Sequence, residues 1–478
     1  MQSIALSLRA RARSSAPAEG LALFRILFGA LMCIGLTRFL WQGWVDTLYV
    51  EPKIFFKFPG FSWVPVWPRE GMYAHYVVLL GLSFSLCVGF FTRLSACLFL
   101  VGFGLIQLMD VTNYLNHYVL VLWFAFWLSL APSGQVYSVD AWRKKRRAAP
   151  LPDGQSASSI PTCWYDIFRF QIASVYVFAA VAKMGSDWLL HGQPMGIWMS
   201  TRSHLPVLGP LLALPAMPLV MSWAGFLYDA TIVFWLSWKK TRLWAYLTVL
   251  AFHGMTSALF DIGMFPGIMV ISTTLFFAPA WPKKIFTLGA RRAQTDSPDP
   301  ESVGGKAPNI PLAAPTTPRL AWGTLAVIIS FQILFPLRAF AYPGDVLWGE
   351  QGMRFSWRVM VREKSGSITY HVHSPSRNRT WQTSPHDYLT WRQANEMSGQ
   401  PDLILQLAHI IAADFRSRGI LDVEVRAETW VSLNGRPPQA LIDPTRDLAR
   451  ESDGFAPATW IMSPPVSPPL PSAGLAQR

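Results

Sequence analysis

The chain has 478 residues, of which 51% are hydrophobic and only 14% are charged, and its mean hydropathy is +0.27. Because a soluble globular protein carries about 25% charged residues, this composition excludes an ordinary soluble protein and indicates an integral membrane protein. The formal charge of +13 could suggest nucleic-acid binding, but the basic residues occur in short runs between apolar stretches, as in membrane-protein loops. The sequence therefore predicts the lipid bilayer as a partner, and no nucleic acid.

A polytopic α-helical membrane fold follows from the apolar stretches, since a helix needs about 20 mostly apolar residues to cross a bilayer. This criterion predicts about nine transmembrane helices, of which the first is expected to remain uncleaved because no small-residue cleavage pattern follows it. The approximate ranges are 21–40, 73–91, 94–111, 117–131, 167–184, 219–238, 243–260, 264–279 and 320–340.

Clusters of Lys and Arg predict the orientation. They lie at residues 9–13, 93, 143–147, 239–242 and 283–292. With nine spans all five clusters fall on one side of the membrane, and Lys and Arg accumulate on the cytoplasmic side. We therefore expect a cytoplasmic N-terminus and an exoplasmic chain after about residue 342, which is periplasmic if the membrane is a bacterial inner membrane.

The domain organisation is predicted from shifts in composition. Residues 1–341 form the transmembrane helical domain, with a flexible linker rich in Pro, Ala, Ser and Gly at about 293–318. Residues 342–462 form a small exoplasmic α+β module, and the Pro-rich tail 463–478 is expected to be disordered. Within the module we expect strands at 355–361, 367–372 and 422–432, a turn at 364–366, a helix at 401–418 and a hairpin turn at Asn434-Gly435.

Three ionisable residues lie at membrane depth. Lys183 is just inside the end of span 167–184, His253 is near the middle of span 243–260, and His117 begins span 117–131. Polar groups are expensive to keep in hydrocarbon, so such residues are functional hypotheses by default. The predicted orientation places Lys183 and His117 near the exoplasmic surface and His253 about 12 Å deeper, at 1.5 Å per helical residue.

Each of these residues also has a purely structural interpretation. Lys183 can extend to the lipid headgroups or pair with Asp187, and His117 can bond a carbonyl at a helix start. His253 can bond the backbone of a neighbouring helix, and Asp229 within span 219–238 can bond a neighbour on its own helix. The functional alternative is a lysine held as a neutral amine by apolar surroundings and therefore able to accept a proton.

Several familiar chemistries have no motif in this chain. It contains no Gly-rich phosphate loop, no His-Glu-x-x-His, no Cys-x-x-Cys and no Gly-x-Ser-x-Gly. Its four cysteines give no disulfide framework and no zinc spacing, and nothing in the spacing of His117 and His253 favours haem, so we expect no metal site. Catalysis would then use side-chain acid-base groups and a bound small molecule.

Characteristic sequence motifs surround the three ionisable residues. Residues 116–118 read NHY, residues 180–188 read AVAKMGSDW, and residues 252–266 read FHGMTSALFDIGMFP. In their residues and in their order along the chain, these stretches resemble the vitamin K-dependent gamma-glutamyl carboxylase family, including its bacterial members with the horizontally transferred transmembrane (HTTM) domain. Residues 355–361, 434–436 and 443–444 are also similar, so that the resemblance covers about residues 20–450.

The resemblance implies a carbon–carbon bond-forming lyase. In that family the lysine matched by Lys183 acts as base on reduced vitamin K, a hydroquinone, which reacts with dioxygen to give a stronger base and finally the epoxide. That base removes a gamma proton from a protein glutamate, and the carbanion adds carbon dioxide. The histidine matched by His117 is linked to the carboxylation half, and His253 matches a histidine that lines the site. The motif residues that we further assign to the cofactor are Asn116, Met184, Trp188 and Met255.

We therefore expect a membrane enzyme that takes an exported Glu-containing protein or peptide as its substrate. The C-terminal module is shorter than that of the animal carboxylases, which leaves alternatives open. The quinol could be vitamin K hydroquinone or menaquinol. The chain could also be a quinol epoxidase or oxidase without a protein substrate, or a non-catalytic membrane protein that binds a lipid or quinone.

Overall fold

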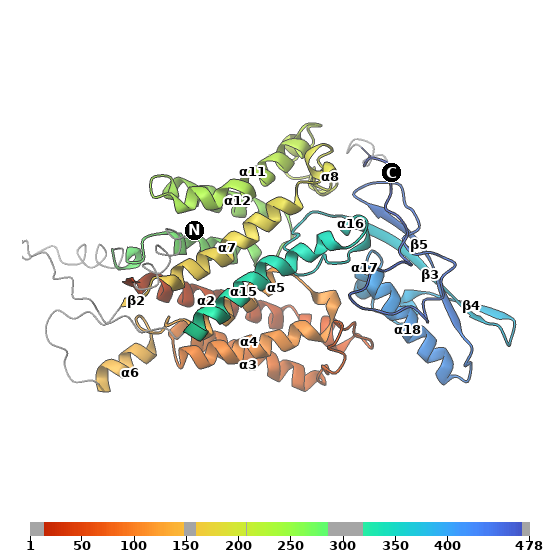
Figure 1. Ribbon diagram of the computed structural model, residues 1–478, viewed down its shortest axis with the longest axis horizontal. Coiled ribbons are helices and arrows are strands. Elements are labelled where there is room, and N and C mark those ends of the chain that lie inside the picture. The colour runs from red at the N-terminus through yellow and green to blue at the C-terminus, as the bar shows by residue number, and fades with distance from the viewer. Residues whose placement is uncertain (1–13, 148–158, 207, 285–318, 471–478) are drawn as a thin grey trace, which may run out of the picture.

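The computed structural model describes residues 14–147, 159–206, 208–284 and 319–470. Helices fill most of its length, and a smaller α+β part lies at one end (Figure 1). The predicted linker at 293–318 and the first basic cluster at 9–13 lie outside the described residues. Residues 463–470 of the predicted tail form no helix or strand.

The helical part carries an apolar helix in each of the nine predicted ranges. These helices are α2 (Glu19–Trp41), α3 (Arg69–Val88), α4 (Thr92–Met109), α5 (Asn116–Leu130), α7 (Cys163–Ala182), α11 (Met217–Ser237), α12 (Arg242–Leu259), α13 (Phe265–Thr273) and α15 (Arg319–Leu337). Among the described residues, six helices are long and apolar enough to span a membrane: α2, α3, α4, α7, α11 and α15. Helix α5 and the pair α13–η3 (η3, Thr274–Phe276) are shorter, and α12 is less apolar. The predicted class, a polytopic helical membrane protein with a small α+β module, is confirmed.

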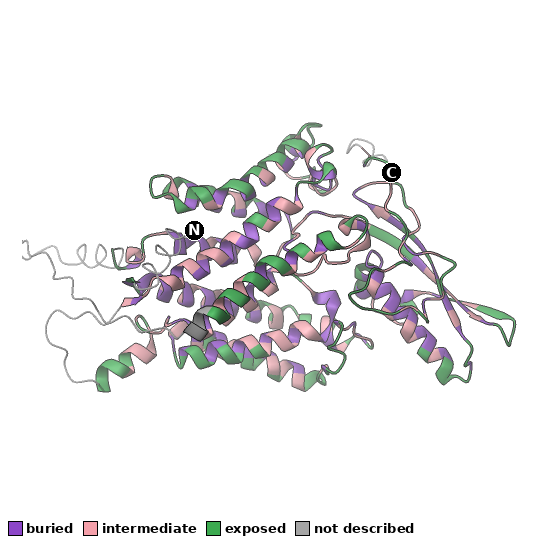
Figure 2. Ribbon diagram, viewed as in Figure 1, coloured by how far each residue is buried: buried purple, intermediate pink, exposed green. Residues whose placement is uncertain are grey.

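Aromatic side chains and close helix contacts form the core of the helical part. The ring of Phe24 on α2 lies 5.1 Å from that of Phe124 on α5 and 5.3 Å from that of Phe168 on α7. Helices α2 and α3 approach so closely that a Cβ added to Gly29 would lie 2.5 Å from the backbone nitrogen of Cys87. The inner faces are buried and the outer faces exposed (Figure 2), and these outer faces carry large apolar side chains, as helices facing lipid do.

Basic loops gather at the end of the helical part that is remote from the module. Helix α6 (Val139–Arg147) lies at this end (Figure 1), as does the short sheet of β1 (Ser15–Pro17) and β2 (Ser159–Pro161). The guanidinium of Arg143 lies over the rings of Phe90 and Phe91, which places the α3–α4 turn and its Arg93 at the same end. This arrangement is the one that the predicted orientation requires, although the orientation itself stays a prediction.

The module contains a three-stranded antiparallel sheet with three α-helices and one short 3-10 helix. The strand order is β4-β3-β5, and α18 packs on the sheet. Its elements are α16 (Val346–Gly349), β3 (Lys364–Ser374), β4 (Arg379–Thr383), η5 (Pro385–Asp387), α17 (Trp391–Met397), α18 (Pro401–Ser417) and β5 (Glu424–Leu433). The predicted helix at 401–418 and strand at 422–432 are confirmed.

Two predictions in the module are wrong. Residues 355–361 form turns instead of a strand, because Phe355, Trp357 and Met360 have φ values of +61°, +56° and +53°, which a strand excludes. Residues 364–366 form no turn, since they pair with residues 431–433 as the first part of β3. Asn434 and Gly435 do form a turn with positive φ, and the chain after it returns to the sheet through a single bridge between Val431 and Gln439.

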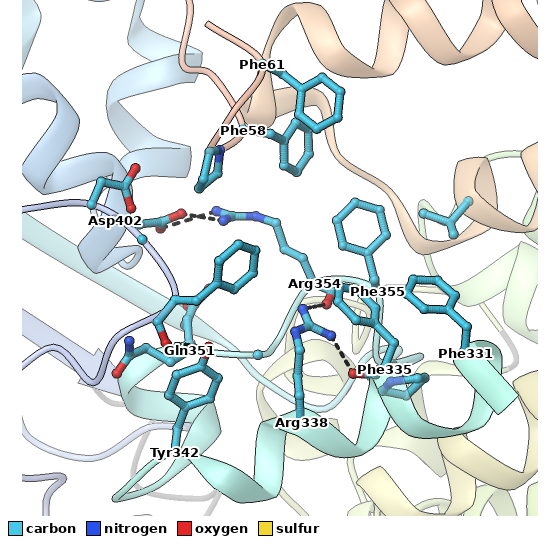
Figure 3. Close-up of a pocket in the computed structure, with 18 of the residues that line it drawn as sticks. Phe58, Phe61, Phe331, Phe335, Arg338, Tyr342, Gln351, Arg354, Phe355 and Asp402 are labelled. Atoms are coloured by element: carbon cyan, nitrogen blue, oxygen red, sulfur yellow. Dashed lines mark hydrogen bonds and ion pairs between the residues drawn. The ribbon is translucent and has the colours of Figure 1, made fainter. Parts of the chain in front are cut away.

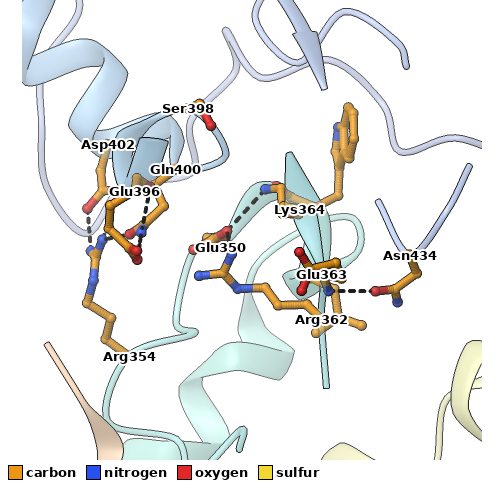
Figure 4. A network of polar contacts seen from close by, with 12 residues as sticks. Glu350, Arg354, Arg362, Glu363, Lys364, Glu396, Ser398, Gln400, Asp402 and Asn434 are labelled. Atoms are coloured by element: carbon orange, nitrogen blue, oxygen red, sulfur yellow. Dashed lines mark hydrogen bonds and ion pairs between the residues drawn. The ribbon is translucent and has the colours of Figure 1, made fainter. Parts of the chain in front are cut away.

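A buried charge network fixes the start of β3 (Figure 4). The Lys364 ammonium donates to Glu350 at 3.1 Å and to the carbonyl of Trp348 at 2.8 Å. Arg362 lies 3.1 Å from the same carboxylate, so Glu350 joins two cations. Burial lowers the pKa of Lys364 to about 8.

Polar side chains join the module to the helical part. Gln393 on α17 donates to Asp110 Oδ2 at 3.0 Å and to the carbonyl of Ile54 at 2.9 Å. Burial raises the pKa of the Asp110 carboxyl. Arg392 donates to the carbonyl of Thr112 at 3.0 Å. The turn between α4 and α5, which leads directly to His117, is therefore held by the module.

Candidate functional site

Lys183 forms a buried ion pair with Asp229. The lysine follows the last residue of α7, and its Nζ donates to Asp229 Oδ2 on α11 at 2.8 Å. The two side chains are only 8% and 9% exposed. The ring of Trp188 lies 5.2 Å from the same Nζ. Lys183 therefore turns inward instead of reaching for headgroups, and its partner is not Asp187.

The pair holds an amino group and a carboxyl group together away from solvent. Burying two charges costs several kcal/mol per ion after relaxation, by the usual desolvation argument, and their attraction offsets part of that cost. The same two groups without charge, an amine beside a carboxylic acid, carry a smaller desolvation cost. Asp229 is the carboxyl group within hydrogen-bond distance of Lys183 Nζ.

A second polar group lies on the neighbouring helices. His253 on α12 is 2% exposed, and its Nε2 shares a hydrogen bond of 3.1 Å with the hydroxyl of Tyr176 on α7. That hydroxyl lies 3.2 Å from the hydroxyl of Tyr228, which directly precedes Asp229. The other ring nitrogen, Nδ1, is buried and has no hydrogen-bond partner among the described residues. His253 therefore bonds a side chain and not the backbone of a neighbouring helix.

His117 begins α5 and is also buried, at 8% exposure. Within the described part of the chain neither of its ring nitrogens has a hydrogen-bond partner, so the carbonyl bond considered for it does not form. Its ring centroid lies 6.2 Å from that of Phe265, which in turn lies 6.0 Å from that of His253. Gly263, with φ of +60°, faces the His117 ring, and a Cβ there would lie 3.7 Å away. Phe265 thus stands between the two histidines.

The other residues assigned to the cofactor divide into two groups. Trp188 is 4% exposed and donates to the carbonyl of Ser222 at 2.7 Å, so its ring is fixed against Lys183. Asn116 accepts from the hydroxyl of Tyr114 at 3.0 Å and donates to the carbonyl of Arg358 at 3.3 Å. By contrast, Met184 and Met255 are 63% and 37% exposed and do not join the buried group.

The module reaches this site through Asp187. Arg436 donates to both carboxylate oxygens of Asp187 at 2.6 Å, and Asn434 donates to one of them at 2.8 Å. Burial alone would raise the pKa of Asp187, but the hydrogen bonds from Arg436 and Asn434 outweigh burial and lower it. Because Asp187 directly precedes Trp188 on α8 (Ser186–Leu189), the module anchors the segment that covers Lys183.

Sequence reasoning did not assign Tyr176, Asp229 and Arg436 to the site. Tyr176 lies seven residues before Lys183, about two helical turns away and on the same face, a spacing that was available as a signal. Asp229 was recognised as a costly placement, but its partner depends on how α11 is rotated against α7. Arg436 lies in a matched motif, yet its partner is more than two hundred residues away in sequence.

The buried group combines polar groups with aromatic rings. Lys183 and Asp229 form a buried pair, and His253 Nδ1 lacks a partner among the described residues. The ring of Trp188 lies 5.2 Å from Lys183 Nζ, and that of Phe265 lies 6.0 Å from the His253 ring. A hydroquinone has hydroxyl groups that could bond the polar groups and a flat apolar face that could pack on the rings.

Comparison with known protein families gives two matches. Residues 13–281, more than half of the chain, match the HTTM domain, and residues 317–466 match the vitamin K-dependent gamma-carboxylase lumenal domain. No solved structure matches the chain. The first match contains Lys183, Asp229 and both histidines, and the second contains Arg436 and the turn that bonds Asp187. The chain therefore belongs to the vitamin K-dependent gamma-carboxylase family.

Proposed function

We propose that this protein uses reduced vitamin K, or a menaquinol, to carboxylate glutamate residues of exported proteins, with epoxidation of the quinol by dioxygen. The observation that carries the proposal is the buried Lys183–Asp229 pair beside His253 in a membrane protein of the carboxylase family. A protein or peptide substrate would approach from the side of the lumenal-type module.

The acidity of glutamate explains why such a protein needs a quinol. An amine cannot remove a glutamate gamma proton, because the acidity gap is too large for general-base catalysis near neutral pH. A hydroquinone hydroxyl is within reach of Lys183 in its amine form. When bound, reduced vitamin K supplies through its oxidation by dioxygen the basicity needed for the glutamate.

Within this scheme the side chains hold the ring and move one proton. Lys183 would accept the proton from a hydroxyl, and Asp229 would exchange a proton with Lys183. His253 would bond a ring oxygen through Nδ1, while its Nε2 is held by Tyr176. Trp188 and Phe265 exclude water, which protects a strong base from quenching. We assign His117 to the glutamate side, following the resemblance of residues 116–118 to the family motif.

The test measures the two products separately. Purified full-length protein in detergent receives reduced vitamin K or menaquinol, dioxygen, labelled bicarbonate and a Glu-containing peptide. Epoxide and labelled peptide together support the proposal. Epoxide without label identifies a quinol epoxidase, and neither product with a bound quinol identifies a non-catalytic binding protein. The variant Lys144→Ala, at an exposed lysine on α6, is the matched control for Lys183→Ala and should keep full activity.

A further inference from the structure

A cavity of about 910 Å³ lies between α4, α5, α15 and the module (Figure 3). Its walls on α5 are Val119, Leu122, Trp123 and Phe126, which lie on the helix face opposite His117. None of Lys183, His117 and His253 lines it. The cavity is therefore separate from the candidate site.

The part of the cavity within the helices is apolar and faces lipid. Leu100, Leu122 and Phe126 line one side, and Val327 and Phe331, which are 69% and 50% exposed, line the other. The volume is near the upper end of the roughly 300–1,000 Å³ of small-molecule sites. Such a space accepts a hydrocarbon chain that enters from the bilayer.

One polar side chain interrupts these apolar walls. Gln332 on α15 lines the cavity and is only 4% exposed, and neither Nε2 nor Oε1 has a hydrogen-bond partner among the described residues. Leaving a buried amide unpaired is costly, so the amide calls for a partner from outside the chain. Gln332 lies six residues before Arg338, about 9 Å along the helix. A polar group that lies between the hydrocarbon chain and the headgroup of a ligand would contact the Gln332 amide.

The module end of the cavity carries one unpaired charge of each sign. Arg338 donates to the carbonyls of Phe335 and Arg354, at 2.8 Å and 2.5 Å, but no described carboxylate lies within 4 Å of it. Asp453 accepts from Gln406 at 3.0 Å and likewise has no cation within 4 Å among the described residues. By contrast, Arg354 in the same cavity is paired with Asp402 (Figure 3). A headgroup with both charges would complement this end.

We propose that the cavity binds a zwitterionic glycerophospholipid with a phosphoethanolamine headgroup. The phosphate meets Arg338, the ammonium meets Asp453, an ester oxygen accepts from the amide of Gln332, and one acyl chain lies along α5. This lipid joins the helical part to the module on the side away from the Lys183 site.

Photolabelling in vesicles tests this assignment. The full chain is reconstituted in phosphatidylglycerol with a trace of phosphatidylethanolamine that carries a diazirine on one acyl chain, and labelled peptides are mapped. Peptides 119–126 and 327–335 report on the cavity, and 220–234 on the outer face of α11 reports on ordinary lipid contact. We expect unlabelled phosphatidylethanolamine to reduce cavity labelling about tenfold more than labelling of α11, by mass action at a specific site.

Three variants separate the site from the surrounding lipid. Gln332→Met and Asp453→Asn should each lower cavity labelling about fivefold, as expected for one lost hydrogen bond or charge contact. Leu334→Met, an exposed neighbour on α15 that does not line the cavity, should leave it unchanged. Asp453 is an exposed loop residue, so its variant tests the headgroup without disturbing the helices. The proposal would be overturned if the labelling of the cavity peptides changed in parallel with that of the α11 peptide in every variant. It would also be overturned if unlabelled menaquinone, and not unlabelled phosphatidylethanolamine, reduced the labelling of the cavity peptides.

Discussion

In the proposed reaction Lys183 acts as a base, and Asp229 is its hydrogen-bonded partner. Asp229→Asn keeps a hydrogen-bond partner for Nζ but removes the group that takes its proton. We expect epoxide formation to fall about 100-fold in this variant, the lower range for loss of a general acid-base group. Lys183→Ala should abolish epoxide and labelled peptide alike, as measured by product chromatography. Unchanged epoxide formation in Lys183→Ala would remove the lysine from the mechanism.

A stability measurement separates this chemical role from folding. Removing one partner of a buried ion pair leaves an uncompensated charge and costs about 3–5 kcal/mol, whereas replacing both partners by apolar residues is often neutral. The double variant Lys183→Met/Asp229→Leu should therefore unfold near the wild-type temperature while Lys183→Met alone unfolds earlier. An inactive double variant with wild-type stability would assign the loss to chemistry.

Tyr176 gives a finer test of the same site. Tyr176→Phe removes the partner of His253 Nε2 and of the Tyr228 hydroxyl, so the ring of His253 loses its fixed orientation. We expect the KM for the quinol to rise about fivefold, the effect of one hydrogen bond, with a smaller change in kcat. Tyr246→Phe on the same helix as His253 is the control, because its hydroxyl makes only a 3.5 Å bond to a carbonyl. Equal effects of the two variants would count against a positioning role for Tyr176.

These residues also show what a sequence can predict at this level. Lys183, His117 and His253 can be identified as site candidates from the sequence because ionisable groups are rare in apolar stretches. The motifs around them also resemble those of a known family. Their partners are not recognisable in the same way. The contact between Lys183 and Asp229 depends on the rotation of two helices whose apolar residues are spread around their surfaces, so no periodicity identifies the facing residue.

Among the elements, α8 and the turn after β5 are joined by the Asp187–Arg436 pair. Arg436→Ala would leave the Asp187 carboxylate buried with one remaining donor, Asn434. We expect a loss of about 3 kcal/mol in the free energy of unfolding, together with lower epoxide formation because Trp188 is no longer anchored. Thermal unfolding and product assays measure the two effects.

A matched arginine shows whether the effect is specific to this clamp. Arg446 pairs with Glu451 at 3.5 Å and is 44% exposed, so Arg446→Ala should change stability by less than about 1 kcal/mol. Arg436→Lys should restore part of the anchoring, since it keeps the charge but not the two parallel bonds. Full activity in Arg436→Ala would show that the module does not position the site.

The start of β3 predicts a pH dependence of the module. Burial lowers the pKa of Lys364 to about 8 from its ordinary 10.5. Between these values the unfolded chain binds a proton at this lysine that the folded chain has lost, so the free energy of unfolding rises with pH across this window. Below about pH 8 the buried ammonium makes its full unfavourable contribution.

Thermal unfolding at pH 7.5 and pH 9.5 measures this contribution. Wild-type protein should gain stability between the two pH values relative to Lys364→Met, in which Glu350 keeps its contact with Arg362 (Figure 4). Lys144→Met on the exposed face of α6 should behave as wild type. If wild type and Lys364→Met gained the same stability between the two pH values, groups other than Lys364 would cause the pH dependence.

The two wrong predictions in the module, a strand at 355–361 and a turn at 364–366, have one physical origin. In residues 355–361, apolar and polar residues alternate over the first part, as in a strand. Trp357, however, is buried in the core of the helical part, and the positive φ values around it allow the chain to make that contact. Residues 364–366 have the composition of a turn, yet the ladder with β5 holds them extended. In both places tertiary contacts outweigh local propensity.

For the molecule as a whole, the helices could be predicted because hydrophobic length is a strong signal. Helix α6 and the module lie at opposite ends (Figure 1), but which end faces the cytoplasm stays a prediction. The orientation in the membrane is tested by cysteine labelling in intact cells. Ser376→Cys in the turn after β3 should react with an impermeant maleimide, whereas Lys144→Cys on α6 should react only after permeabilisation. The native protein, with Cys33, Cys87, Cys97 and Cys163, gives the background. The reverse pattern would place the module in the cytoplasm, away from exported proteins, and would contradict a role in carboxylating them.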